Sequence, residues 1–263
     1  MADLAETAGS LTADGLARLG AVPGWFGRVI AGLLNVVGAA IAGVAGILGG
    51  VPAGVLRVLG GVVVWDRRLV LRGAVGVGSS IGGAVVLLAG TVVASVQRLV
   101  GAEAPARPLS QAERVMLRDV FGDSLSYVNV RIVEGRSGAF GANQRPFTLG
   151  NTIYLKDVDL EERPDVLVHE VVHVWQYQHE GPRYTTDALG AQVLYGYRGR
   201  GAYDWRAELA RGRTSWTELN KEAQGSFIQE VWRSGDQTEL AVDATAAVQG
   251  RRTLRLSGRM RRR

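Results

Sequence analysis

The chain has 263 residues, enough for one large domain or two smaller ones with a buried core. It contains no cysteine, which excludes disulfide bonds and thiolate metal sites. Its net charge of +5 is uneven, because residues 1–108 carry +3, residues 109–250 carry −5 and residues 251–263 carry +7. The basic character therefore belongs to the two ends and not to the central segment.

The first residues, Met1 to Glu6, lack the basic stretch and the short apolar run of a secretory signal. We therefore expect no cleaved signal peptide, so that any export follows another route. Residues 1–27 are small, polar and weakly helical, and the breaker Pro23-Gly24 interrupts them.

Two long segments without charged residues follow, residues 29–56 and residues 73–97. Each is long enough to cross the hydrocarbon core of a bilayer, which takes about 20 helical residues. Small residues recur in them every four positions, which on a helix makes a smooth ridge that lets two backbones approach closely. Three interpretations stay open: a pair of membrane-associated helices, a tightly packed soluble or partner-bound helical hairpin, or compositional drift of a GC-rich coding sequence.

Residues 102–108 read A-E-A-P-A-R-P, the composition of a linker. We place the domain boundary there, which divides the chain into 1–108, 109–250 and 251–263. Ser110 and Glu113 form a capping box that predicts a helix, which Gly122 ends. Alternation of apolar and polar residues from 127 to 133 predicts a strand, and residues 147–149 and 152–155 around Gly150-Asn151 predict a β-hairpin.

Three further helices are predicted. The first runs from Pro164 to about His179, where Gly181-Pro182 stops it. The others span about residues 185–197 and 217–232, with Gly- and Arg-rich loops between them. Short strands followed by helices predict an α+β domain.

The helix from Pro164 contains H-E-x-x-H at His169, Glu170 and His173. Residues four apart on a helix lie about 40° apart around its axis, so the two imidazoles can share one zinc ion. Glu170 is rotated by about 100° from His169, where its carboxylate can take a proton from water without ligating the metal. Gln176 lies on the same side as His169, which predicts a hydrogen bond to a ligand or a packed polar residue.

A third protein ligand is needed, and several residues qualify. Glu222 on a later helix is the favoured candidate, because zinc sites commonly combine two histidines with one carboxylate. His179 has the spacing of a third histidine ligand, but Gln176 replaces the glycine that would turn the chain there. Glu208 and Glu218 are further alternatives. Tyr195 and Tyr197 are weaker candidates for stabilising an oxyanion.

These residues also resemble a known family. The segment R-P-F-T-L-G-N-T-I-Y-L at 145–155, the motif H-E-V-V-H-V-W-Q-Y-Q and the later N-x-E-x-Q are similar to the zinc metallopeptidase domain associated with bacterial extracellular contractile injection systems. The resemblance covers about half of the chain. It implies a gluzincin-like fold with His169, His173 and Glu222 as zinc ligands and Glu170 as general base.

The sequence thus predicts an α+β fold: a mostly helical, minimal gluzincin-like domain with a small β-sheet, preceded by an apolar Gly/Ala-rich helical hairpin. The expected function is zinc-dependent hydrolysis of peptide bonds in a protein or peptide substrate. The resemblance implies an effector or cargo of a bacterial injection system, secreted or injected by a non-classical route or associated with a membrane through residues 29–97. The alternative is a membrane-acting or structural protein whose zinc domain is an inactive scaffold.

The last thirteen residues hold seven arginines and no acid. Such a cluster attracts phosphate groups of nucleic acid or anionic lipid. No aromatic residues interleave with it and no recognised nucleic-acid fold accompanies it, so we expect no nucleic-acid partner. A solvated tail, a lipid-facing tail and a docking signal remain alternatives.

Overall fold

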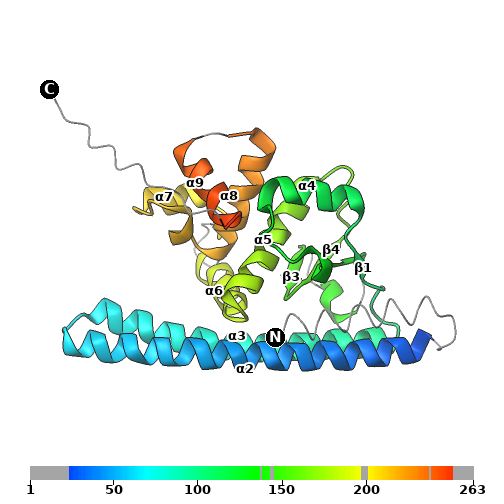
Figure 1. The fold of residues 1–263 in the computed structure, drawn as a ribbon, viewed down its shortest axis with the longest axis horizontal. Coiled ribbons are helices and arrows are strands. Elements are labelled where there is room, and N and C mark those ends of the chain that lie inside the picture. The colour runs from blue at the N-terminus through cyan, green and yellow to red at the C-terminus, as the bar shows by residue number, and fades with distance from the viewer. Residues whose placement is uncertain (1–23, 137, 143–144, 197–200, 237, 251–263) are drawn as a thin grey trace.

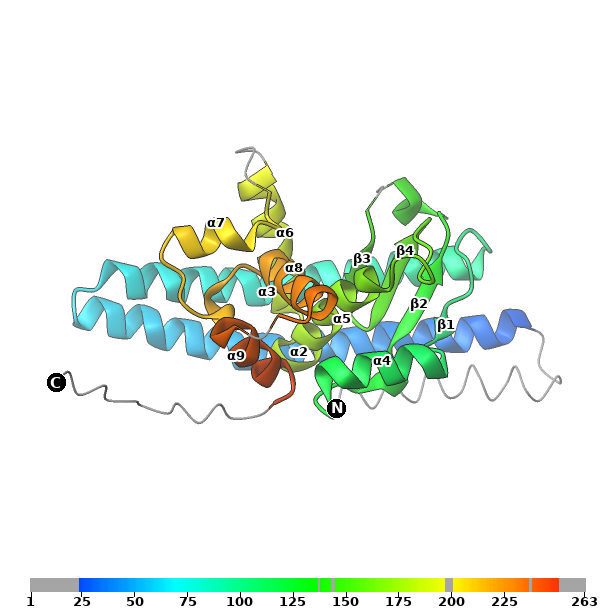
Figure 2. The same ribbon diagram turned by 90° about the horizontal axis from the view of Figure 1, so that it is seen from above.

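The structure, a computed structural model, describes residues 24–136, 138–142, 145–196, 201–236 and 238–250. Two long antiparallel helices form one layer, and a compact α+β unit lies on one side of them (Figure 1, Figure 2). The predicted fold class is confirmed. The helices are α2 (Gly24–Val63), α3 (Arg67–Leu99), α4 (Gln111–Phe121), α5 (Pro164–Glu180), α6 (Arg183–Gly196), α7 (Trp205–Ala210), α8 (Lys221–Ser234) and α9 (Glu239–Val248), and the strands are β1 (Arg107–Pro108), β2 (Arg131–Glu134), β3 (Phe147–Leu149) and β4 (Thr152–Lys156).

The two uncharged segments lie in α2 and α3, which extend beyond them at both ends. Small residues let the helices touch: a Cβ built at Gly54 would lie 2.6 Å from Cγ2 of Val77, and one built at Gly61 would lie 2.7 Å from the amide nitrogen of Val70. At the turn, the Asp66 side chain accepts hydrogen bonds from two backbone amides and caps α3. The ridge of small residues therefore forms a close helix pair.

The sheet has four strands in the order β1-β2-β4-β3, with β2 and β4 parallel and the other pairs antiparallel. The predicted hairpin of β3 and β4 is confirmed, and Gly150 takes the positive φ of 61° that its turn needs. The predicted strand at 127–133 is wrong in its first half. Residues Tyr127–Asn129 form a 3₁₀ turn, in which Val128 is exposed and Asn129 is buried with its amide on the hydroxyl of Ser126.

Strand β1 lies within the segment that we predicted to be a linker, and Arg107 pairs with Ile132 of β2. The division of the chain at residues 108 and 250 remains a prediction, and the Arg-rich tail lies outside the described residues. Ser110 and Glu113 form the predicted capping box of α4, and Gly122 ends that helix.

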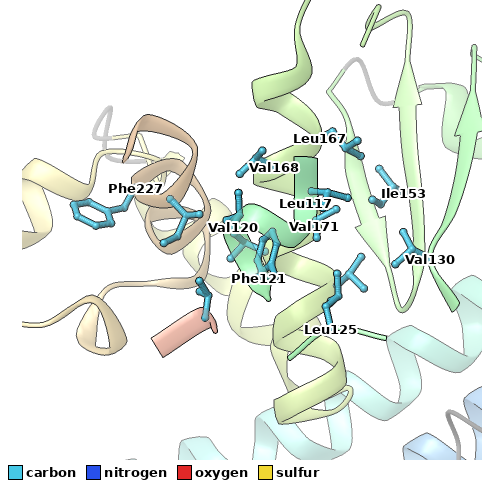
Figure 3. Close-up of a cluster of buried hydrophobic side chains, with 14 of the residues drawn as sticks. Leu117, Val120, Phe121, Leu125, Val130, Ile153, Leu167, Val168, Val171 and Phe227 are labelled. Carbon is cyan, nitrogen blue, oxygen red and sulfur yellow. The ribbon is translucent and has the colours of Figure 1, made fainter. Parts of the chain in front are cut away.

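Helix α5 runs through the centre of the α+β unit, as Figure 1 shows. Its apolar side chains belong to one buried cluster with residues of the sheet, α4 and α8, and Figure 3 shows Val168 and Val171 of α5 in this cluster. Pro164 stands in the first turn, and Gly181 ends the helix with a φ of 70°. The core therefore fixes α5 on several sides.

The later part of the chain differs from the prediction in three places. Helix α8 begins at Lys221 and not near residue 217, because Asn220 accepts hydrogen bonds from the amides of Glu222 and Ala223 and sets its start. Residues Trp216–Glu218 form a separate 3₁₀ turn. Helices α7 and α9 were not predicted, since both are short and α7 lies within a Gly- and Arg-rich segment.

Candidate metal centre

The two histidines of H-E-x-x-H lie on the side of α5 that faces α8. The rings of His169 and His173 are buried, and their centroids are 5.1 Å apart. Four-residue spacing on one helix brings both Nε2 atoms toward the same point. Helix α5 thus supplies two nitrogen donors to one buried position.

Glu222 comes from the first turn of α8 and completes the group. Its Oε2 lies 3.6 Å from Nε2 of His169 and 3.4 Å from Nε2 of His173. Donors bound tetrahedrally to zinc at about 2.0–2.1 Å are separated by about 3.3–3.4 Å. The three side chains are therefore spaced to hold one small metal ion.

The structure separates the other candidate ligands from this group. His179 is exposed, its Nδ1 lies 2.8 Å from the carbonyl oxygen of Trp175, and its ring stacks on the Trp175 indole. Glu208 pairs with Arg211, and Glu218 accepts a hydrogen bond from the amide of Thr214. Among the described residues, only His169, His173 and Glu222 meet as a group of three metal-ligating side chains.

Glutamine side chains set the tautomers of both histidines. Nδ1 of His169 lies 3.2 Å from Oε1 of Gln229, whose Nε2 donates to the Asp165 carboxylate at 2.7 Å. A carboxylate only accepts, so the Gln229 oxygen must face the imidazole and His169 donates through Nδ1–H. This leaves Nε2 of His169 with a free lone pair for a metal.

The predicted hydrogen bond of Gln176 is present on the second histidine. Nδ1 of His173 lies 2.8 Å from Oε1 of Gln176. Nε2 of Gln176 donates to Oε1 of Gln224 and to the carbonyl of Lys221, which fixes the orientation of the amide. The neutral His173 therefore also carries its proton on Nδ1 and points Nε2 at Glu222.

Two residues that the sequence did not single out complete the surroundings of the three ligating side chains. A Cβ built at Gly225 would lie 2.9 Å from Cε1 of His169, so only glycine lets α8 approach α5 at this point. Gln192 of α6 donates to Oε1 of Glu222 at 2.8 Å, which leaves Oε2 of Glu222 to face the histidines.

In the metal-free centre, the neighbouring charges stabilise the ionised forms of His173 and Glu222. Burial opposes the imidazolium of His173, but the nearby carboxylates of Glu222 and Glu170 outweigh it and raise the pKa of His173 to about 9. Burial also opposes the Glu222 carboxylate, yet the two histidines hold the pKa of Glu222 far below its usual range. The carboxylate is thus kept ionised for a cation.

Glu170 lies beside the three ligating residues and not among them. Its Oε2 lies 2.9 Å from the hydroxyl of Thr148 on β3. Burial raises the pKa of Glu170, although both histidines oppose that shift. A carboxylate whose pKa is raised is a stronger base than an ordinary glutamate, which suits a group that takes up a proton and later releases it.

A cavity of about 350 Å³ opens beside Glu170, His173 and Glu222. Its walls come from separate elements, including β3, α6 and the middle of α3, and Val86 and Gly90 are the residues that α3 contributes. Such a cavity is large enough for a side chain and the adjoining backbone of a peptide.

Tyr203 lines the same cavity, although its sequence context predicts no role for it. Its ring centroid lies 5.7 Å from that of His169, and the Arg145 guanidinium lies 5.3 Å from its centroid. Burial and the Glu222 charge raise the pKa of Tyr203 to about 12, so the hydroxyl keeps its proton. No periodic pattern surrounds Tyr203 in the sequence, and the side chains of Tyr195 and Tyr197 lie outside the described residues.

Residues 108–181 match the family described as eCIS core domain. The chain is 33% identical over 100 residues to the type VI secretion system spike protein VgrG2b of Pseudomonas aeruginosa, an alignment that covers 34% of this chain and 10% of that protein. The solved effector domain of Pseudomonas aeruginosa VgrG2b is 22% identical, with a TM-score of 0.40, over 65% of this chain and 97% of that domain.

The chain therefore corresponds to about a tenth of the length of the curated relative that it matches. The matched family segment begins at β1 and ends just after α5, so it includes His169, Glu170 and His173 but neither Glu222 nor the helical hairpin.

Proposed function

We propose that this protein is a zinc-dependent metallopeptidase that hydrolyses peptide bonds in a protein or peptide substrate. The observation that carries the proposal is the convergence of His169, His173 and Glu222 on one point in the wall of a cavity that also holds Glu170. A metal centre with a buried carboxyl group beside it is the arrangement that metal-assisted hydrolysis requires.

When bound at this point, zinc supplies a Lewis acid that polarises a carbonyl group and lowers the pKa of a water molecule. Glu170 then takes the proton of the attacking water on its carboxylate and passes it to the leaving amine nitrogen. Thr148 holds one carboxylate oxygen of Glu170 by hydrogen bond, which leaves the other oxygen for this proton.

Tyr203 fits the role of a donor to the carbonyl oxygen. Its hydroxyl stays protonated across the physiological range, because its pKa is raised to about 12. It lines the cavity beside the two ligand-bearing helices, where negative charge develops as the carbonyl is attacked.

The test is turnover of an unfolded protein substrate by the full chain. Glu170→Gln keeps the shape of the side chain and removes the base, so we expect a loss of about 10²–10⁴ in kcat with metal content unchanged. Glu162→Gln is the matched control, because Glu162 is exposed just before the same helix. Equal turnover of Glu170→Gln and wild type contradicts the proposal.

We further propose that the protein is an effector or cargo of a bacterial injection system, secreted or injected by a non-classical route. The matched eCIS core domain and the similarity to a secretion-system spike protein support this. Recovery of the chain with purified injection particles, and its loss when particle assembly is blocked, is the direct test.

A second candidate role comes from α2 and α3. Both helices are long and apolar enough to cross a membrane, and only 22% and 28% of their most apolar windows are buried. We propose that residues 29–97 contact a lipid bilayer. If this contact is the active part, the metal domain is a scaffold, and Glu170→Gln leaves the effect of the protein on membranes unchanged.

A further inference from the structure

The middle of the helix pair α2 and α3 contains no charged residue. This uncharged section runs from Gly32 to Gly54 in α2 and from Val77 to Ser95 in α3. Close contacts set the alignment of the two helices: a Cβ built at Gly32 would lie 3.3 Å from Cβ of Ser95, and Gly54 meets Val77 at the other end. Gly32 and Gly54 are 22 positions apart, which corresponds to about 33 Å at 1.5 Å per residue. This length matches the hydrocarbon core of a bilayer, which is about 30 Å thick.

Arginines flank this section on both sides. Arg28 lies before it in α2, and Arg57 and Arg72 lie toward the turn. Arg98 is at the open end and pairs with Glu103 at 2.7 Å. Positive charge at both ends suits the phosphate groups of two lipid leaflets, whereas a second copy of this pair would bring arginines together.

The outer face of the section is a continuous exposed surface of large aliphatic side chains. They recur at intervals of three or four residues along each helix, and once of seven in α2, which places them on one helical face. The exposed residues are Leu33, Val37, Ile41, Val44, Leu48, Val55, Ile81, Val85, Leu88, Val92 and Val96. Soluble proteins rarely expose an apolar surface of this extent without a partner.

The α+β unit covers the other side of the same section. Gly82 of α3 meets Thr186 of α6, where a built Cβ would lie 2.9 Å from Cγ2, and the Thr186 hydroxyl donates to the carbonyl of Ser79 at 2.8 Å. Farther along α3, a Cβ built at Gly90 would lie 2.8 Å from Leu149. Figure 1 shows the unit lying along the middle of the two helices and not at their end.

These contacts have a steric consequence. A helix pair that crosses a bilayer buries its uncharged section in hydrocarbon, where the charged surface of the α+β unit cannot follow. The contacts at Gly82 and Gly90 lie inside that section. Insertion of the helices and docking of the α+β unit therefore cannot occur together.

We propose that α2 and α3 insert as a pair into a lipid bilayer, and that insertion requires the α+β unit to leave α3. This inference rests on the proposed membrane contact and not on peptidase activity. Departure of the unit removes Val86 and Gly90 from the wall of the candidate catalytic cavity. The docked structure is then the form before insertion, and the inserted form has a more open cavity.

A disulfide tests this directly, because the chain has no native cysteine. Gly82→Cys with Thr186→Cys joins α3 to α6 at a distance suited to a disulfide. Gly32→Cys with Ser95→Cys joins α2 to α3 and is the matched control, since the pair inserts as one body. Each full-length variant is mixed, oxidised or reduced, with vesicles of phosphatidylcholine and phosphatidylglycerol, and protease protection of the helices is measured.

We expect the oxidised α3–α6 variant to lose protection and to regain it on reduction, while the control is protected in both states. Equal protection of the oxidised and reduced α3–α6 variant overturns the inference, as does loss of protection in the oxidised control. If no sample shows protection, the inference and the proposed membrane contact are both overturned, whether or not the protein forms dimers. The peptidase proposal does not depend on this result.

A second pair of variants tests the inference without a disulfide, by weakening the docking of the α+β unit on α3. Gly82→Leu places a side chain against Thr186 and weakens docking, so it increases the protected fraction. Gly78→Leu adds the same side chain on the same helix, where nothing lies within 4 Å of a built Cβ, and serves as control. Equal protected fractions of the two variants count against the inference.

Discussion

Nε2 of His173 lies 3.4 Å from Oε2 of Glu222, although 49 residues separate them in the chain. The two residues belong to α5 and α8, which pack against each other directly. The geometry of the candidate metal centre therefore depends on how closely these helices approach, and the first two predictions below concern that approach and its hydrogen bonds.

Gly225→Ala tests the close approach of the two helices. The added methyl group would lie 2.9 Å from Cε1 of His169, so the helices must separate or the imidazole must move. We expect a loss of about 1–3 kcal/mol in the free energy of unfolding and weaker metal binding. Gly190→Ala on α6 is the control, since nothing lies within 4 Å of its built Cβ. Chemical denaturation with and without zinc gives both values, and equal behaviour of the two variants contradicts the prediction.

Gln229→Leu tests the hydrogen bond that orients His169. The change removes the acceptor from Nδ1 of His169 and a donor from the Asp165 carboxylate. We expect zinc affinity to fall about 10–100-fold. Competition with a fluorescent chelator measures it, with the exposed Gln111→Leu as control. An unchanged affinity would mean that Gln229 does not orient the ligand.

Zinc binding is expected to strengthen as pH rises from 6.5 to about 9. In the metal-free protein the pKa of His173 is raised to about 9 by Glu222 and Glu170, against the effect of burial. The proton on His173 therefore stabilises the metal-free fold fully below pH 6.5, and this stabilisation is lost as pH rises through 9. Zinc requires the neutral imidazole, so protons compete with the metal below pH 9.

The corresponding measurement is the difference in Tm between zinc-loaded and metal-free protein over this pH range. We expect the difference to grow with pH, and to be absent at every pH in His173→Ala, which lacks one of the three ligating side chains. A difference that is constant across the range argues against proton release from His173 on binding.

Tyr203→Phe removes the hydroxyl from the wall of the cavity and keeps the ring beside His169. If the hydroxyl donates to the developing oxyanion, kcat falls about 10²–10³-fold while KM and zinc content change little. A rise in KM at constant kcat would assign Tyr203 to substrate binding instead.

Much of the fold could be predicted, because the deciding patterns are local. The capping box at Ser110 and Glu113, the turn at Gly150 and the stop at Gly181 each set an element through neighbouring residues. Strand β1 could not be predicted, since a two-residue strand is formed by its pairing with β2. The 3₁₀ turn at residues 127–129 was also not predicted, because the alternating pattern there indicates a strand. In the structure the Asn129 side-chain amide donates a hydrogen bond to the Ser126 hydroxyl and favours the turn.

The candidate site likewise contains residues that the sequence predicts and residues that it does not. Helical spacing alone brings His169 and His173 together. It places Gln176 in line with His169 and predicts a hydrogen bond to a ligand, which the structure shows on His173. Residues that reach the site from other helices and loops have no fixed spacing from His169 and His173 in the sequence, so no pattern identifies them. Gln192 reaches it from α6 and Tyr203 from the residues just before α7. Gly225 has its role only through the contact with α5.

Zinc content of purified variants tests the central claim most directly. Wild-type protein is expected to hold about one zinc ion per chain, and His169→Ala and Glu222→Ala are expected to hold essentially none. His179→Ala, which removes the remaining histidine, is expected to match wild type. A Glu222→Ala protein that is folded and binds zinc as wild type does would contradict the account.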